Sequence, residues 1–446
     1  PWGFPVMLAP IYATFGLHLF ALKIIGILSY LGFLVVIWYG FERFHSLLWR
    51  SAYVLFFAVN PTLIGFVNHI LSDIPFLCVS TLAICLIGQI IVEQRVFWSR
   101  VKDRVLLGII IACAFFIRTN GILLFGVLCW SQLVVMCSFI WSRHKQGMAW
   151  KEATVGSCVK DLENPHKRLL PFVPYISLGC FVLFWKLILP EGGTSHLEHL
   201  ERVNTESIKG NSIYYKDLLA GFFAGIPDYG VHKGQWIAYI ITLPFVVIGL
   251  TRHIRIAHHM LIYILLTYAL FILWPHKQGL RFLFPVLPFY ILFFISGVSV
   301  FARGRQVWAQ TLTTLVCVLP ISFALFHFGA RSIHQAEIQL QTRNRVKHGP
   351  FADYSLEMFD FIQKQTTMEE TIVFFKPRVM RLMTNRNAVR IDNVNNLLVA
   401  DYVCFFNNLH PFHIKQMQVL EQQQRAKIKF SNKHYVVYKL HHTAQS

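Results

Sequence analysis

Three short segments place charged side chains between long apolar stretches, where charge is expensive. A charged side chain at mid-membrane costs about 2.5–3.5 kcal/mol on insertion scales, so charges kept at the ends of apolar stretches are candidates for function. Arg and Lys bind phosphate through charge-assisted hydrogen bonds, and a carboxylate can orient a hydroxyl, bind a metal or pair with a partner cation. The candidates are Asp73, then Arg118 and Asn120 in one turn, then His276, Lys277 and Arg281 within one basic segment.

Each segment also has a structural interpretation. Ser72 and Asp73, with Pro75 close behind, are typical of a helix start. Arg118 is compatible with a hairpin turn whose guanidinium reaches the interface. The basic segment 276–281 is compatible with contacts to lipid headgroups. We favour function for Arg118, which lies in an otherwise uncharged turn, and for the basic segment. For Asp73 the two interpretations can hold together.

The composition decides what kind of protein holds these segments. The 446 residues are 55% hydrophobic and 14% charged, with a mean hydropathy of +0.50. Soluble chains carry about 25% charged residues, so a water-soluble enzyme is excluded. The abundance of Phe and Trp excludes a disordered chain, and nine Cys in this length exclude a disulfide scaffold. No metal-ligand spacing of Cys or His is present. A multi-spanning membrane protein remains.

Apolar stretches long enough to form membrane helices recur as far as about residue 328. A spanning helix needs about 20 mostly apolar residues. We predict about ten spans, with a short interfacial or re-entrant helix over 1–17 before them and a long outer loop over 190–235. The spans are near 18–41, 51–67, 74–92, 104–117, 121–141, 170–189, 236–250, 259–274, 283–300 and 308–328.

The loops between these stretches predict the orientation. Cations gather in alternate loops, which the positive-inside rule places in the cytoplasm. The opposite loops are short and poor in cations, apart from 190–235 and the basic segment 276–281. Inner loops and the polar tail therefore account for most of the net charge of +19, and nucleic acid is not the expected partner. The inner-loop cations run from Arg43 to Arg50, Arg95 to Arg104, Arg143 to Arg168, Arg252 to Arg255 and Arg303 to Arg305.

The composition changes after about residue 330, where Gln, Asn, Arg and His become frequent. Strand-like runs occur at 371–375, 401–406 and 434–438, and a helix is predicted over 376–384 because Pro377 suits a first turn. The predicted fold class is therefore an α-helical multi-spanning membrane domain over 1–330. A small extracytoplasmic α/β domain over 331–446 follows it.

The first apolar segment and the three charged segments, in this order along the chain, resemble the C-type glycosyltransferases that use lipid-phosphosugars. The nearest group is that of the protein O-mannosyltransferases and lipid A aminoarabinose transferases of bacterial inner membranes. The resemblance rests on the segments 1–16, Ser72–Phe76, Ile117–Gly121 and Gly279–Pro285, and in the tail on Val373–Arg378 and 429–439.

The resemblance implies an inverting transfer of a sugar from a polyprenyl phosphate to an acceptor hydroxyl at the outer membrane face. It implies that Arg118, Lys277 and Arg281 stabilise the leaving phosphate, with His276 and Asn120 in the same site. Asp73 then orients the acceptor or binds a divalent metal. The resemblance also implies a bacterial inner membrane and a periplasmic tail. The chain begins Pro1-Trp2-Gly3, so we expect a preceding span and the main catalytic base to lie in sequence before it.

Other functions are compatible with the same residues. A transporter, a flippase-like protein or an oligosaccharide ligase handling polyprenyl-linked glycans also needs cations at the outer face, and so does a non-catalytic lipid-binding relative. No symmetry between halves of the chain supports a transporter. The sequence identifies neither the sugar nor the acceptor, and it leaves metal dependence and oligomeric state open.

Overall fold

The computed structural model describes two compact units, Pro1–Gln335 and Ala336–Ser446. Every statement below concerns the described residues. These exclude 1, 94–99, 147–168, 189–203, 222–232, 275–276, 278, 302–321, 323–324, 339, 342–348, 391–399, 407–420, 423 and 442–446.

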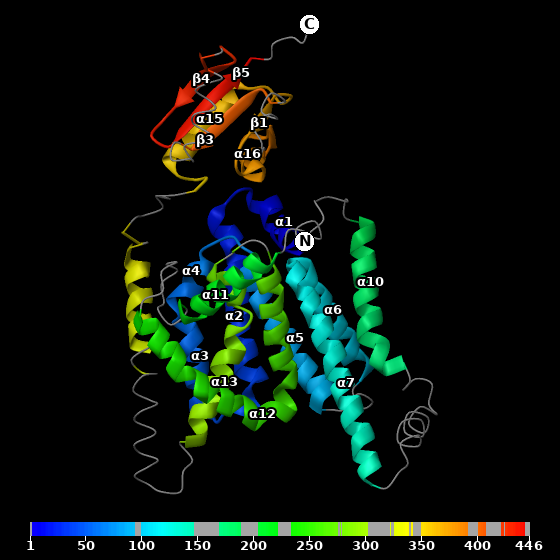
Figure 1. The fold of residues 1–446 in the computed structure, drawn as a ribbon. Helices are drawn as coiled ribbons and strands as arrows, with labels where there is room; N and C mark the ends of the chain where they lie inside the picture. Colours follow the sequence, from blue (N-terminus) through cyan, green and yellow to red (C-terminus); the bar gives the residue numbers. More distant parts are fainter. Residues whose placement is uncertain are drawn as a thin grey trace. The chain divides into compact units, whose positions relative to one another are not determined.

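The first unit is a bundle of helices (Figure 1). Its described helices are α1 (Gly3–Phe15), α2 (Leu19–Gly40), α3 (Leu47–Ala58), α4 (Pro61–Val67), α5 (Asp73–Ile87), α6 (Val101–Ile117), α7 (Ile122–Lys145), α10 (Val173–Ile188), α11 (Thr205–Gly221), α12 (Lys233–Leu273) and α13 (Leu287–Phe301). Among the described residues, five helices are long and apolar enough to cross a membrane, or six if the bent pair α3 and α4 is one span. The α-helical membrane class is confirmed, while the number of about ten spans remains a prediction.

The bend between α3 and α4 has a local cause. Asn60 lies two residues after α3 and caps α4, because its side-chain oxygen accepts hydrogen bonds from the amides of Thr62 and Leu63 at 3.1 Å. Pro61 follows as the first helical residue, where its missing N–H has no cost. The two helices meet at 53°.

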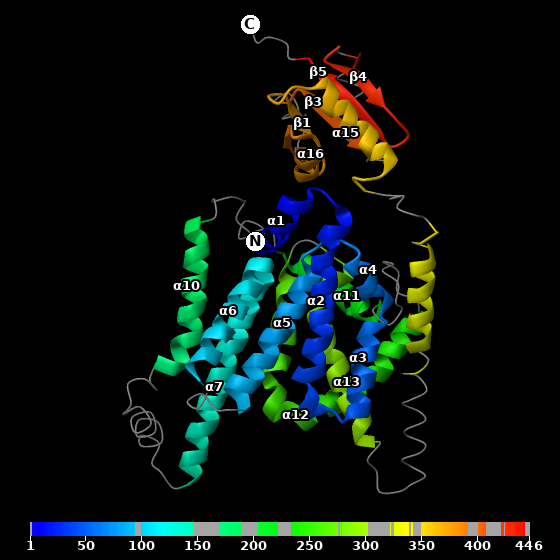
Figure 2. The same cartoon turned by 180° about the vertical axis from the view of Figure 1, so that it is seen from behind.

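The predicted spans 236–250 and 259–274 and the loop between them form one helix, α12, which holds Arg252 and Arg255 within a helical turn. Its 41 residues are about twice the length of one straight crossing, and its ribbon does not run straight in Figures 1 and 2. The last predicted span, 308–328, lies mostly outside the described residues.

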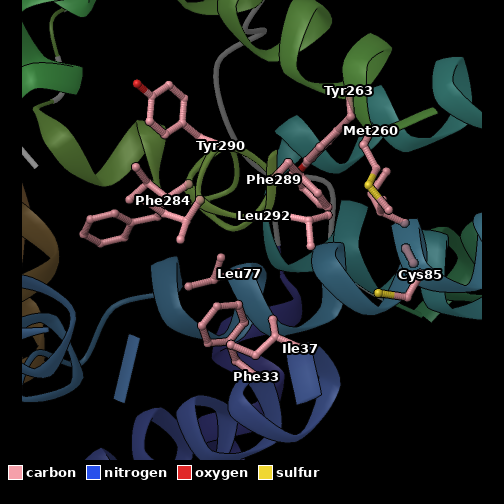
Figure 3. Packing of buried hydrophobic residues seen from close by; sticks show 14 of the residues in the cluster. Phe33, Ile37, Leu77, Cys85, Met260, Tyr263, Phe284, Phe289, Tyr290 and Leu292 are labelled. Carbon is pink, nitrogen blue, oxygen red and sulfur yellow. The ribbon is translucent and has the colours of Figure 1, made fainter. Parts of the chain in front are cut away.

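The core of the bundle lies where α2, α5, α12 and α13 meet. Figure 3 shows apolar side chains from all four helices pointing toward one another. Phe33 of α2 and Phe289 of α13 are fully buried, and Tyr53 of α3 donates a hydrogen bond to the carbonyl of Pro288 at 2.9 Å. In a membrane such close packing, rather than exclusion of water, holds helices together.

Helices α12 and α13 approach each other closely at Gly249 and Gly297. A Cβ on Gly297 would overlap the backbone carbonyl of Phe245, and a Cβ on Gly249 would lie 2.8 Å from the amide nitrogen of Gly297. Small residues at such crossings let two backbones pack directly. Glycine is therefore required at both positions by space rather than by backbone angle.

We expect Gly297→Val to lower the melting temperature of the purified protein markedly, because the backbones of α12 and α13 would have to separate. Overpacking typically costs about 1–3 kcal/mol. The matched control is Gly329→Val, since a Cβ there meets no atom within 4 Å. Equal melting temperatures for the two variants would contradict the assignment of this contact.

The second unit is a five-stranded sheet with helices α15 (Asp353–Gln365) and α16 (Pro377–Thr384). The strand order is β2-β1-β3-β5-β4, with β2, β1 and β3 parallel and β3, β5 and β4 antiparallel. Figure 2 shows α15 lying across one face of the sheet. The strands are β1 (Thr371–Val373), β2 (Asn387–Val389), β3 (Tyr402–Phe406), β4 (Ala426–Ser431) and β5 (Tyr435–Leu440).

The α/β character of the tail is confirmed in detail. The three predicted strands correspond to β1, β3 and β5, and the predicted helix to α16, which begins at Pro377 as expected. The sequence did not predict β2 and β4. β2 has only three residues, and β4 carries Lys427 and Lys429 at a sheet edge, where such charges discourage further pairing.

Candidate functional site

Asp73 and Arg118 meet at one end of the bundle. Asp73 begins α5, and Arg118 follows the last residue of α6. A guanidinium nitrogen of Arg118 donates a hydrogen bond to the Asp73 carboxylate and forms an ion pair with it. The side chain of Asp73 is 3% exposed and that of Arg118 is 15% exposed. The two sequence candidates are therefore one largely buried ion pair.

The expected capping role at the start of α5 is only partly met. Ser72 occupies the N-cap position but makes no side-chain hydrogen bond there. Pro75 lies in the first turn, as predicted. Asp73 also lies in the first turn, where a negative charge is favourable to the helix dipole. The carboxylate therefore serves the helix and the ion pair together.

Arg281 contacts the same aromatic ring as Arg118. It lies in the short helix η8 (Leu280–Leu283), next to Phe282. The Arg118 guanidinium carbon is 5.0 Å from the centre of the Phe282 ring, and that of Arg281 is 5.7 Å from it. Arg118 also lies 5.8 Å from the ring of Phe76 on α5. The structure thus gathers two arginines from segments far apart in the chain around one phenylalanine.

Helix α11, within the predicted outer loop 190–235, forms the next layer. The Asn211 side chain donates hydrogen bonds to the carbonyls of Ile272 at 3.1 Å and Trp274 at 2.7 Å, at the end of α12. Tyr215 is buried and its ring centre lies 5.6 Å from that of Phe271. The ammonium of Lys277 is 5.1 Å from the ring of Tyr214. α11 is thereby fixed beside the basic segment.

His69 adds a titratable group to this end of the bundle. It lies between α4 and α5, is exposed, and packs against Phe66 with ring centres 5.9 Å apart. The pKa of His69 lies below its ordinary value, because desolvation and the charge of Lys23 disfavour the imidazolium. The Asp73 carboxylate acts in the opposite direction. A lowered pKa favours a neutral imidazole near pH 7.

The structure describes five of the six predicted site residues. Arg118 and Arg281 both lie over the ring of Phe282, Asp73 is paired with Arg118, and Lys277 is exposed beside Tyr214. Asn120 lies half-buried in the turn after Arg118. His276 lies outside the described residues. Among the residues that the structure describes, no group of three or more His, Cys, Asp or Glu is placed to hold a metal ion.

Sequence reasoning passed over four residues of this site: Asn211, Tyr214, Phe282 and His69. A polar and aromatic run within an outer loop carries no periodicity that marks it as a lid or a wall. His69 was within a segment that the sequence singled out, and its proximity to Asp73 in the chain was the available signal. Phe282 lies between the two features that were recognised, Lys277 and Arg281 on one side and Pro285 on the other.

No protein-family model matches the chain, and no curated protein matches it by sequence. Among solved structures, it is similar to ArnT from Cupriavidus metallidurans bound to undecaprenyl phosphate, at 12% identity and a TM-score of 0.60 over 100% of this chain and 88% of that one. It is also similar to the archaeal oligosaccharyltransferase AglB from Archaeoglobus fulgidus in complex with an inhibitory peptide and a dolichol-phosphate. That match has 8% identity and a TM-score of 0.56, over 99% of this chain and 66% of that one. The predicted C-type glycosyltransferase fold is confirmed.

Proposed function

We propose that the chain is an integral membrane glycosyltransferase. It moves a sugar from a polyprenyl-phosphate donor to an acceptor hydroxyl at the outer face of the membrane, with inversion. The observation that carries the proposal is the meeting of Arg118 and Arg281 around Phe282, with Lys277 nearby. The fold supports it, because two proteins of this fold are described with a polyprenyl or dolichol phosphate bound.

The leaving group explains why cations are needed. The acceptor oxygen forms a bond to the anomeric carbon while the bond from that carbon to the phosphate oxygen breaks. The phosphate leaves with the electron pair, and its developing charge needs electrostatic stabilisation rather than a proton. Arg118, Lys277 and Arg281 supply that charge, and His276 and Asn120 complete the phosphate site.

The acceptor hydroxyl must lose its proton to a base. Asp73 is the acidic residue of this site, but its carboxylate is bonded to Arg118. We therefore assign Asp73 to holding Arg118, and through it to orienting the acceptor, or to a divalent metal, rather than to being the main base.

The location is proposed from charge. Cations concentrate in alternate loops, which orients the multi-pass chain with the site on the outer side. A bacterial inner membrane, with the unit 336–446 in the periplasm, is the setting that we propose. Single-cysteine labelling of intact cells at position 364, in the second unit, tests it. Access by an impermeant reagent is expected, and labelling only after lysis would contradict this orientation.

The transfer itself is tested with the full-length chain in detergent or liposomes. Polyprenyl-phosphate donors with different radiolabelled sugars are supplied together with lipid, peptide and glycan acceptors. We expect transfer of label from a polyprenyl-phosphate sugar. Transfer only from a polyprenyl-diphosphate oligosaccharide would favour the ligase. Movement of the lipid across the bilayer without bond formation would favour the flippase or transporter.

A further inference from the structure

We propose that Phe282 is a positioning residue that holds the guanidinium groups of Arg118 and Arg281 in place for one shared anion. The inference rests on the proposed function for its ligand, the phosphate of a polyprenyl phosphate. The guanidinium carbons of Arg118 and Arg281 lie 5.0 Å and 5.7 Å from the centre of the Phe282 ring, so both arginines contact one side chain.

The Phe282 ring is fixed from behind. It stacks on Phe271 of α12 with ring centres 4.6 Å apart and an interplanar angle of 26°. Phe271 is 1% exposed and contacts the ring of the buried Tyr215 on α11. Asn211 ties α11 to the carbonyls at the end of α12. The Phe282 ring therefore packs on α12, which is in turn held by α11.

The Phe282 ring attracts both guanidinium groups, but the two arginines differ in their other surroundings. A guanidinium over an aromatic face is attracted by the ring quadrupole, and the attraction strengthens where water is excluded. Arg118 is largely buried and forms an ion pair with Asp73, so its position is fixed both by the carboxylate and by the ring. Arg281 approaches from the neighbouring position in the chain, in the short helix η8. The ring therefore gives the two guanidinium groups one common contact.

A shared support matters because a phosphate is bound by several donors at once. An anion held by two guanidiniums requires them at a fixed spacing, and a misplacement of 1 Å can reduce a rate about 100-fold. The ring therefore acts on affinity for the anion through the arginines, without itself contacting the phosphate. Truncating the ring should loosen the anion site and leave the rest of the fold intact.

The experiment measures binding of undecaprenyl phosphate to the full chain in detergent, together with transfer kinetics. We expect Phe282→Leu to weaken binding about tenfold and to raise the donor KM, while Phe282→Tyr stays within about threefold. The matched control is Phe284→Leu. Phe284 lies two residues on and is 1% exposed, and its ring packs on Phe66 at 4.8 Å. This control should lower the melting temperature but leave affinity unchanged.

A double-mutant cycle separates positioning from general packing. If Phe282 acts through Arg281, Phe282→Leu should add little to the loss already caused by Arg281→Ala. Full additivity, or an equal loss of affinity in Phe284→Leu, would overturn the inference. Binding that depends on Phe282 without any sugar transfer would overturn the proposed function alone. A parent chain that does not bind undecaprenyl phosphate would overturn both.

Discussion

Replacing Arg118 by Met is expected to be among the most damaging single changes in this chain. It leaves Asp73, whose side chain is 3% exposed, as an unpaired buried carboxylate. Breaking a buried ion pair by removing one partner typically costs about 3–5 kcal/mol, because the remaining charge stays out of water. We expect a fall of this size in the free energy of unfolding of the purified protein, together with complete loss of sugar transfer.

The double variant Asp73→Leu/Arg118→Met makes this prediction specific. Replacing both members of a buried pair by apolar side chains is often neutral or stabilising, so the free energy of unfolding should recover. Transfer should not recover, because the cation that we assign to the phosphate is still absent. Recovery of both properties would mean that the pair is structural only.

An exposed ion pair in the same chain provides the control. Lys364 and Asp360 lie 2.7 Å apart on α15, and their side chains are 67% and 57% exposed. Pairs of this kind contribute about 0–1 kcal/mol, so Lys364→Met should change stability little. If Lys364→Met were as damaging as Arg118→Met, burial would not explain the effect at Arg118.

The Asp73–Arg118 pair shows which part of the site could be predicted from the sequence and which part could not. Asp73 and Arg118 were both selected, each because a charge stood alone between apolar stretches. Their contact spans 45 positions of the chain and depends on how α5 packs against α6, which no local pattern encodes. A metal, an acceptor hydroxyl and a partner cation were equally compatible with the position of Asp73, and the structure shows the cation to be Arg118. Local patterns therefore identified the residues, and tertiary packing decided their relation.

The prediction of a loop over residues 251–258, between two spans, was wrong. The cations Arg252 and Arg255 interrupt an apolar run, and a loop was the natural interpretation of two charges between two spans. In the structure the helix continues through them. Lys and Arg are good helix formers, so charge by itself does not end a helix. A turn signal such as Gly-Pro or Asn-Gly is absent from 251–258, and this absence was the more reliable evidence.

The α11 segment was missed for a different reason. Its sequence is mostly polar, so neither hydropathy nor periodicity marked it within 190–235. Individual contacts hold α11 in the site, such as the hydrogen bond from Asn211 to the end of α12 and the ring contact between Tyr215 and Phe271. Such contacts become visible only when the partner is known. Sites built from several outer connections are therefore the part of a membrane protein that sequence predicts least well.

Arg281→Ala is expected to have the largest effect on chemistry at little cost in stability. Arg281 is half-buried beside Phe282 in η8. If it stabilises charge that develops on the leaving phosphate, its removal should lower kcat for transfer about 100- to 1,000-fold. Arg281→Lys should recover only part of this loss, because an ammonium lacks the planar fork of a guanidinium. Steady-state kinetics with a polyprenyl-phosphate sugar measures both variants.

Lys277→Ala is the matched comparison, because this lysine is exposed and lies over the ring of Tyr214. A solvated cation contributes less than a desolvated one, so we expect a loss of about tenfold or less. The ordering of the two variants tests the geometry. If Lys277→Ala were the more damaging, the leaving phosphate would lie toward α11 and Tyr214. An unchanged kcat in Arg281→Ala would remove Arg281 from the phosphate site, leaving Arg118 and Lys277 as its cations.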